Sequence, residues 1–267
     1  MSRIDETFAR LRAEARVGLV AYVTAGDPDR ERSAEVLRAV DRGGADVIEV
    51  GVPFSDPLAD GPVIQRASER ALRAGMTLSG VLDLVGEVRH ELRAPIVLFT
   101  YANPVVRMGV DAFASRAAAA GVDGVLVLDL PLEEARETRD VFVEAGLDPI
   151  FLVSPTTTPE RIALADALGR GFLYVISRLG VTGARATVAE GAGELAARVR
   201  ASARLPIALG FGLSQPDHVK AVGAFADAAV VGSALVDRIA TSGRDELARD
   251  VEQYVRWLTG RAEGADA

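Results

Sequence analysis

The residues best placed to do chemistry are two acids, Glu49 and Asp60. Glu49 interrupts the apolar run 47–50, where a charge needs a partner or a proton because burial removes its hydration. Asp60 lies in segment 53–61, whose two prolines predict a rigid loop that returns this second carboxylate to the same strand end. Taken singly, Glu49 could be a satisfied buried carboxylate and Asp60 an ordinary turn residue. Together they predict acid–base chemistry.

Three glycine turns follow later strand-like runs and could bind a phosphate. They are residues 177–183, residues 210–214, and Gly232-Ser233 directly before a helix. Glycine permits close approach to main-chain N–H groups, and a helix N-terminus favours negative charge. Because all three turns directly follow strands, they should meet at the same end of the fold, and together they predict a phosphate site. Each turn alone could serve only to reverse the chain.

Aromatic side chains also gather at predicted strand ends. They are Tyr22, Phe99, Tyr101, Tyr174 and Phe211. Core packing is the ordinary role of each ring, but together they could line a flat apolar pocket for an aromatic ligand.

The elements that must position these groups are eight β-prone runs separated by helical segments. The runs are 17–23, 46–50, 95–99, 123–128, 148–153, 171–176, 206–210 and 227–231. They are apolar on both faces, as parallel strands covered by helices must be. The pattern predicts an α/β fold, a (β/α)8 TIM barrel forming a single domain over residues 1–267. An open dinucleotide-binding sheet would need G-x-G-x-x-G after the first strand, where the chain reads TAGDP.

The helices expected around this barrel begin with an amphipathic helix over 2–14, which should cap one end of the barrel. Asp27-Pro28 is expected to supply the N-cap and first residue of a helix over 28–42 that stops at Gly43-Gly44. Extra helices are expected at 61–73 and 245–260, and residues 260–267 should fray.

Composition excludes several classes of function. The formal net charge is −8 and no basic run occurs, which argues against nucleic-acid binding. The absence of Cys excludes thiolate chemistry, and no metal site is expected. His90 and His218 lie alone in helix-like segments and are expected at the surface or at a helix end. No signal sequence or membrane-spanning run occurs, so a soluble, cytoplasmic protein is expected.

The motifs, in order along nearly the whole chain, resemble the tryptophan synthase alpha subunit family. They are TAGDP at 24–28, EVGVPFSDPLADGPVIQ at 49–65, YANP at 101–104, DLPLEE at 129–134, SRLGVTG at 177–183, GFG at 210–212 and GSALV at 232–236. The resemblance implies cleavage of indole-3-glycerol phosphate to indole and glyceraldehyde 3-phosphate. It implies no cofactor in this chain, with indole passed to a beta subunit that carries pyridoxal phosphate in a heterotetramer of two alpha and two beta chains.

The resemblance also implies residue roles. Glu49 would be the acid/base, and Asp60 would accept the indole N–H and stabilise positive charge on the ring. Thr182 resembles a lid residue that contacts Asp60. The substrate- and phosphate-binding positions would be Tyr22, Ile64, Phe99, Tyr101, Tyr174, Thr182, Gly183, Phe211, Gly212, Gly232 and Ser233. Asp56 and Pro131 match partner-facing positions, although Asp56 also fits a simple turn. Tyr22 departs from the family's expected Phe.

Two other interpretations stay open at this point. One is a phosphate-binding barrel isomerase acting on a sugar phosphate; such enzymes place acids on strands 1 and 5, where this chain has Tyr22 and Val153. The other is a catalytically silent activator that keeps the barrel only as a docking surface, against which the intact Glu49 and Asp60 argue.

Overall fold

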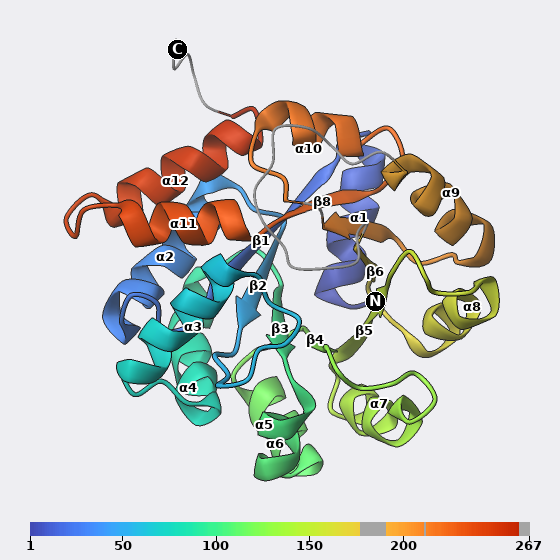
Figure 1. The fold of residues 1–267 in the computed structure, drawn as a ribbon, viewed down its shortest axis with the longest axis horizontal. Helices are drawn as coiled ribbons and strands as arrows, with labels where there is room; N and C mark the ends of the chain where they lie inside the picture. Colours follow the sequence, from blue (N-terminus) through green and yellow to red (C-terminus); the bar gives the residue numbers. More distant parts are fainter. Residues whose placement is uncertain (177–190, 211, 262–267) are drawn as a thin grey trace.

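The structure is a computed structural model that describes residues 1–176, 191–210 and 212–261. Its centre is a closed barrel of parallel strands, in which each strand pairs with the next and β8 closes on β1 (Figure 1). The strands are β1 (Gly18–Thr24), β2 (Val47–Gly51), β3 (Ile96–Thr100), β4 (Gly124–Val127), β5 (Asp148–Val153), β6 (Leu173–Ile176), β7 (Ile207–Gly210) and β8 (Ala228–Val231). This architecture confirms the predicted (β/α)8 barrel.

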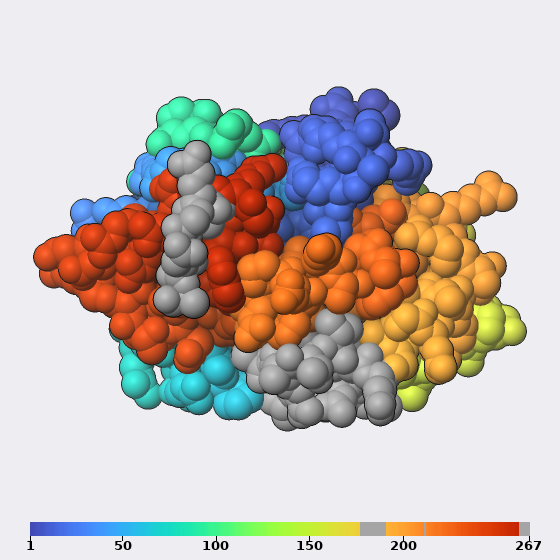
Figure 2. Space-filling model, turned by 90° about the horizontal axis from the view of Figure 1, so that it is seen from above, coloured from blue at the N-terminus to red at the C-terminus, as the bar shows by residue number. Residues whose placement is uncertain are grey.

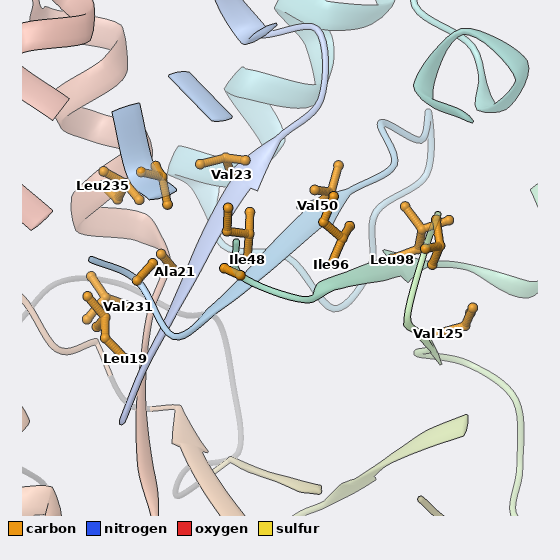
Figure 3. Close-up of a cluster of buried hydrophobic side chains, with 14 of the residues drawn as sticks. Leu19, Ala21, Val23, Ile48, Val50, Ile96, Leu98, Val125, Val231 and Leu235 are labelled. Carbon is orange, nitrogen blue, oxygen red and sulfur yellow. The ribbon is translucent and has the colours of Figure 1, made fainter. Parts of the chain in front are cut away.

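The strands are apolar on both faces because each face meets a different part of the core. On β2, Ile48 and Val50 join the cluster between the strands and the helices, together with Leu98 of β3 (Figure 3). Val47 belongs to the second cluster, inside the barrel. Since side chains alternate along a strand, Glu49 shares the inward face of Val47.

The helices surround the barrel (Figure 1). In the described part of the chain they are α1 (Arg3–Ala13), α2 (Arg30–Gly43), α3 (Pro62–Arg73), α4 (Leu78–Val88), the short 3-10 helix η1 (Arg89–Glu91), α5 (Ala102–Met108), α6 (Val110–Ala119), α7 (Ala135–Glu144), α8 (Pro159–Leu168), α9 (Ala192–Ser202), α10 (Pro216–Val222), α11 (Ser233–Thr241) and α12 (Leu247–Leu258). Helices α3 and α12 confirm the two extra helices that the sequence predicts.

Helix α1 caps one end of the barrel, as predicted. Its apolar stripe, Ile4, Phe8 and Leu11, packs with side chains of the barrel interior. A capping box starts the helix: the Ser2 Oγ accepts from the Asp5 N–H at 3.1 Å, and the Ser2 N–H donates to the Asp5 carboxylate at 3.0 Å. Because this end is filled, a ligand must enter the barrel from the carboxyl ends of the strands.

Segments from the two ends of the chain also meet at the outer surface. Helix α12 packs against α2, and Figure 2 shows the red C-terminal helices beside the blue N-terminal part. Arg42 donates to Glu252 across this contact at 2.8 Å. The last helix thereby packs in the outer layer against α2, α10 and α11.

The predicted start of α2 is wrong by two residues. The N-cap is Asp29, whose Oδ1 accepts from the Arg32 N–H at 2.9 Å, and the helix begins at Arg30. Asp27 is unavailable as a cap because Arg70 holds its carboxylate. The predicted stop is confirmed, since Gly44 adopts a φ of 95° and its N–H donates to the last carbonyls of the helix.

Both histidines lie at the kinds of position that the sequence predicts, the surface or a helix end. His90 is exposed in η1, and His218 lies in the first turn of α10, where it is buried and its Nδ1 accepts from the Ser214 N–H at 3.3 Å. Of the predicted frayed end, residues 262–267 lie outside the described residues. Among the described helices, none combines the length and apolar character needed to span a bilayer.

Candidate active site

Glu49 lies inside the barrel, near the carboxyl end of β2. Its Cα pairs with Tyr22 of β1 and Val97 of β3, so strands on both sides fix its position. The side chain is fully buried, and neither carboxyl oxygen has a hydrogen-bond partner among the described residues. Burial, and next the charge of Asp60, raises the pKa of Glu49 to about 8. The carboxyl group is therefore protonated at neutral pH.

Asp60 lies in the loop between β2 and α3, close enough to Glu49 for its charge to act on that carboxyl group. The Asp60 main-chain N–H donates to the Pro57 carbonyl at 3.1 Å, and the Gln65 side chain donates to the Asp60 main-chain carbonyl at 2.9 Å. Its Oδ2 accepts a hydrogen bond from the Tyr101 hydroxyl at 3.1 Å. Burial raises the pKa of Asp60 to about 6, although the Tyr101 hydrogen bond opposes the shift. Asp60 therefore ionises at a lower pH than Glu49.

Aromatic rings from three strands form the wall around the two acids. Tyr22 meets Phe99 edge-on, with ring centroids 5.3 Å apart, and Phe99 meets Tyr174 at 6.2 Å. Burial, and then the charges of Glu49 and Asp60, raises the pKa of both tyrosines well above the usual range. The tyrosines are therefore neutral, and both lie close enough to Glu49 and Asp60 to be influenced by their charges.

Helix α3 closes one side of this wall. Ile64 is buried in a small cluster with Tyr22 and Val236, on which Phe99 also packs. Tyr101, just beyond β3, stacks obliquely on Phe54 with centroids 5.0 Å apart and accepts from the Ala59 N–H. The predicted pocket residues of β1, α3, β3 and β6 thus lie in one neighbourhood.

Sequence reasoning missed two residues that shape this pocket. A Cβ on Gly51 would overlap the Tyr22 hydroxyl, so only glycine leaves room for that phenol. Gln65 fixes the Asp60 carbonyl, and nothing in its local sequence predicts that contact. Gly51 could have been found, because a glycine at the end of a buried strand often marks a close approach.

The glycine turns after β7 and β8 lie on neighbouring strands, because Gly210 pairs with Val230. Gly212 has a φ of 57°, which favours glycine. Gly232 is the N-cap of α11, and Ser233 is buried at its first position. A Cβ on Gly232 would lie 3.5 Å from the Tyr22 Cβ, so this helix start adjoins the aromatic wall.

Other predicted positions lie elsewhere. Thr182, Gly183 and Phe211 fall outside the described residues. Asp56 and Pro131 are exposed on loops, away from the buried acids. The Asp56 carbonyl accepts from the Leu58 N–H at 2.9 Å, which agrees with its interpretation as a turn residue. The described residues contain no group of three or more His, Cys, Asp or Glu side chains arranged to hold a metal ion.

Comparison of the chain with known proteins identifies its family. The family model of the tryptophan synthase alpha chain matches residues 8–262. The tryptophan synthase alpha chain of Burkholderia pseudomallei (strain 1106a) is 48% identical over 267 residues, covering 99% of this chain and 98% of the relative. That of Chloroflexus aggregans is 45% identical over 264 residues, covering 98% and 99%.

Comparison with solved structures leads to the same family. A chain of Mycobacterium tuberculosis tryptophan synthase superposes with a TM-score of 0.90 at 39% identity, covering 97% of this chain and 98% of that one. The tryptophan synthase subunit alpha of Legionella pneumophila superposes with a TM-score of 0.88 at 36% identity, covering 98% of each. This chain belongs to the tryptophan synthase alpha chain family, and it is a lyase by that membership.

Proposed function

We propose that the chain cleaves indole-3-glycerol phosphate to indole and glyceraldehyde 3-phosphate, the alpha reaction of L-tryptophan biosynthesis. The observation that carries the proposal is the pair of buried carboxyl groups, Glu49 and Asp60, whose pKa values of about 8 and about 6 lie on either side of neutrality. Carboxyl groups whose environments separate their pKa values can take different roles in one reaction.

Glu49 is the proton carrier of the proposed reaction. The bond that breaks joins indole C3 to the glycerol chain, and protonation of C3 lets the ring leave as neutral indole. Glu49 holds a proton at pH 7 and donates it to C3. The resulting carboxylate removes the proton from the adjacent glycerol hydroxyl as the carbon–carbon bond breaks and the aldehyde forms. Glu49 is then protonated again, and such transfer typically contributes about 10²–10⁴-fold.

Asp60 stabilises the charge that the first proton transfer creates. Protonation of C3 leaves positive charge on the ring nitrogen, and the ionised Asp60 accepts the indole N–H. The Tyr101 hydroxyl donates its hydrogen bond to Asp60 Oδ2, so Asp60 Oδ1 would accept the hydrogen bond from the substrate. A fixed carboxylate in a buried site stabilises such charge without reorganisation.

The pocket walls suit the rest of the substrate. Tyr22, Phe99, Tyr174 and Ile64 offer flat apolar surface for the indole ring, and Tyr101 lies beside Asp60. The phosphate would bind at the glycine turns and the α11 N-terminus, where backbone N–H groups are free to donate. The proposed phosphate-side residues are Gly212, Gly232 and Ser233, with Thr182, Gly183 and Phe211 added by the family resemblance.

The proposed partner is a tryptophan synthase beta subunit that carries pyridoxal phosphate, in a heterotetramer of two alpha and two beta chains. Exposed apolar side chains support a docking face on loops and helices after the strands: Leu58 is 95% exposed and Val106 is 68% exposed. Asp56 and Pro131 lie on exposed loops after β2 and β4. Indole released here would pass to the beta active site. General acid–base chemistry needs no cofactor in this chain.

The proposal is tested by incubating the purified chain with indole-3-glycerol phosphate and measuring indole, with and without a beta subunit. Indole release is expected, and its kcat/KM should fall as Asp60 becomes protonated below about pH 6 and as Glu49 ionises above about pH 8. The beta subunit should co-elute and raise the rate. No indole in either mixture would overturn the proposed reaction, and no co-elution would overturn the proposed partner.

A further inference from the structure

We infer that Arg70 is a positioning residue for the reaction: its paired contact with buried Asp27 fixes helix α3, and through α3 the place of Asp60 in the active site. Arg70 touches neither acid of the site. Its guanidinium donates from Nε to Asp27 Oδ1 at 2.7 Å and from an Nη to Oδ2 at 2.8 Å. Two parallel hydrogen bonds fix orientation as well as distance.

Asp27 is a fixed anchor for this contact. Its side chain is 2% exposed, in the loop that follows β1. The main chain around it is held on three sides. Asp27 N–H donates to the Thr24 carbonyl at 3.2 Å, Gly26 N–H to the Ser33 hydroxyl at 3.0 Å, and Ala25 N–H to the Gly51 carbonyl at 2.9 Å. Arg70 therefore binds to a fixed point of the barrel.

Helix α3 connects this anchor to Asp60. Arg70 lies in the last turn of α3, whereas Asp60 directly precedes its N-cap, Gly61. Ten residues of helix span about 15 Å, so a small tilt or slide at Arg70 moves the other end by a similar amount. Gln65, in the first turns of α3, donates to the Asp60 carbonyl, which ties Asp60 to the helix.

The apolar face of α3 does not by itself fix the helix along its axis. This face presents Ile64, Ala67, Ser68 and Ala71, mostly small side chains. Apolar burial is non-directional, so it stabilises contact with the barrel without setting one position along the helix axis. The Asp27–Arg70 pair supplies the directional contact that this face lacks. A displacement of about 1 Å at a reacting group can cost on the order of 10²-fold in rate.

The inference rests on the proposed role of Asp60, and it is tested with Arg70→Gln, Arg70→Lys and the control Arg73→Gln. Arg73 lies on the same helix, is 78% exposed, and makes only a surface ion pair with Glu69 at 3.4 Å. We expect Arg70→Gln to lower kcat by roughly 10-fold or more with a smaller change in KM. Arg70→Lys, which keeps a cation near Asp27, should recover part of the loss, and Arg73→Gln should match the wild type.

A second readout keeps a failure of the inference distinct from a failure of the proposed reaction. The Asp60 titration can be followed by ¹³C NMR of labelled aspartate, assigned with Asp60→Asn and independent of any substrate. In the wild-type background, Tyr101→Phe should shift this titration, because it removes the hydrogen bond to Oδ2. In the Arg70→Gln background the same change should shift it by less than half as much, because Asp60 no longer meets Tyr101.

The inference is overturned if Arg70→Gln keeps kcat within twofold of the wild type, if Arg70→Lys is no better than Arg70→Gln, or if the Tyr101→Phe shift is equal in both backgrounds. Because loss of Arg70 leaves Asp27 buried without its partner, Arg70→Gln should also melt at a lower temperature. The double variant Asp27→Asn/Arg70→Gln removes that buried charge. It should regain stability but not kcat, and a return of kcat to the wild-type value would likewise overturn the inference.

Discussion

Replacing the buried acid Glu49 by its neutral isostere is expected to stabilise the fold while removing the proposed chemistry. The folded protein holds the Glu49 proton up to about pH 8, whereas the unfolded chain releases it near 4.5. Holding that proton at pH 7 therefore costs about 3 kcal/mol of folding free energy, at about 1.4 kcal/mol for each pH unit above 4.5. Glu49→Gln has the same shape, is neutral in both states and does not bear this cost.

The gain in folding stability from Glu49→Gln should depend on pH. Below about pH 4.5 both states bind the proton, so Glu49→Gln should bring no gain. The gain should grow between about pH 4.5 and 8, where only the folded state keeps the proton, and then stay constant. Urea unfolding at pH 5, 6, 7 and 8 measures it, and near pH 7 the melting temperature should rise by roughly 5–10 °C. Asp56→Asn, an exposed change of the same kind in the next loop, is the control.

Two results would refute this reasoning. If Glu49→Gln were no more stable than the wild type at pH 7 and 8, the carboxyl group would not carry a raised pKa. If the gain were the same at pH 5 and pH 8, it would come from packing and not from the proton. Either result would also remove the physical basis for Glu49 as a proton donor at neutral pH.

Three further substitutions test neighbouring features. Tyr101→Phe should raise the pKa of Asp60, because it removes a hydrogen bond that stabilises the carboxylate, and should move the low-pH limb of the kcat/KM profile to higher pH by roughly half a unit or more. An unmoved limb would contradict the proposed effect of this hydrogen bond on Asp60. Gly51→Ala should lower kcat about 10-fold or more, since the new methyl displaces the Tyr22 ring, and steady-state kinetics would show it. Burial raises the pKa of Asp148, whose Oδ2 has no partner among the described residues, so Asp148→Asn should raise Tm at pH 7 and raise it less near pH 4; a lower Tm in calorimetry would oppose this.

The sequence predicts the barrel well because the signals of its elements are local and repeated. Eight apolar runs at regular spacing leave few other folds, and the stripe Ile4, Phe8 and Leu11 fixes the buried face of α1. Glu49 could be found because a single acid in an apolar strand conflicts with its surroundings. Gly44 could be predicted as a helix stop because its cap depends only on neighbouring residues.

The contacts of Asp60 with Tyr101 and of Asp27 with Arg70 could not be predicted, because each joins segments far apart in the sequence. Asp27 was expected to cap α2, a local role that suits any aspartate before a helix. The structure gives the cap to Asp29 and pairs Asp27 with Arg70, forty-three residues away. His218 lies at a helix end, as expected, but its burial could not be predicted, because it depends on what packs over α10. Where local preferences compete, tertiary contacts decide.

The central claim is that Glu49 carries the proton of the reaction. The most direct test is the kcat of indole release by purified Glu49→Gln at saturating indole-3-glycerol phosphate, with binding of inorganic phosphate and the circular dichroism spectrum measured on the same sample. The account predicts a native spectrum, phosphate binding like that of the wild type and a kcat lowered by at least about 10²-fold. A folded Glu49→Gln protein that keeps more than a few per cent of wild-type turnover would contradict it.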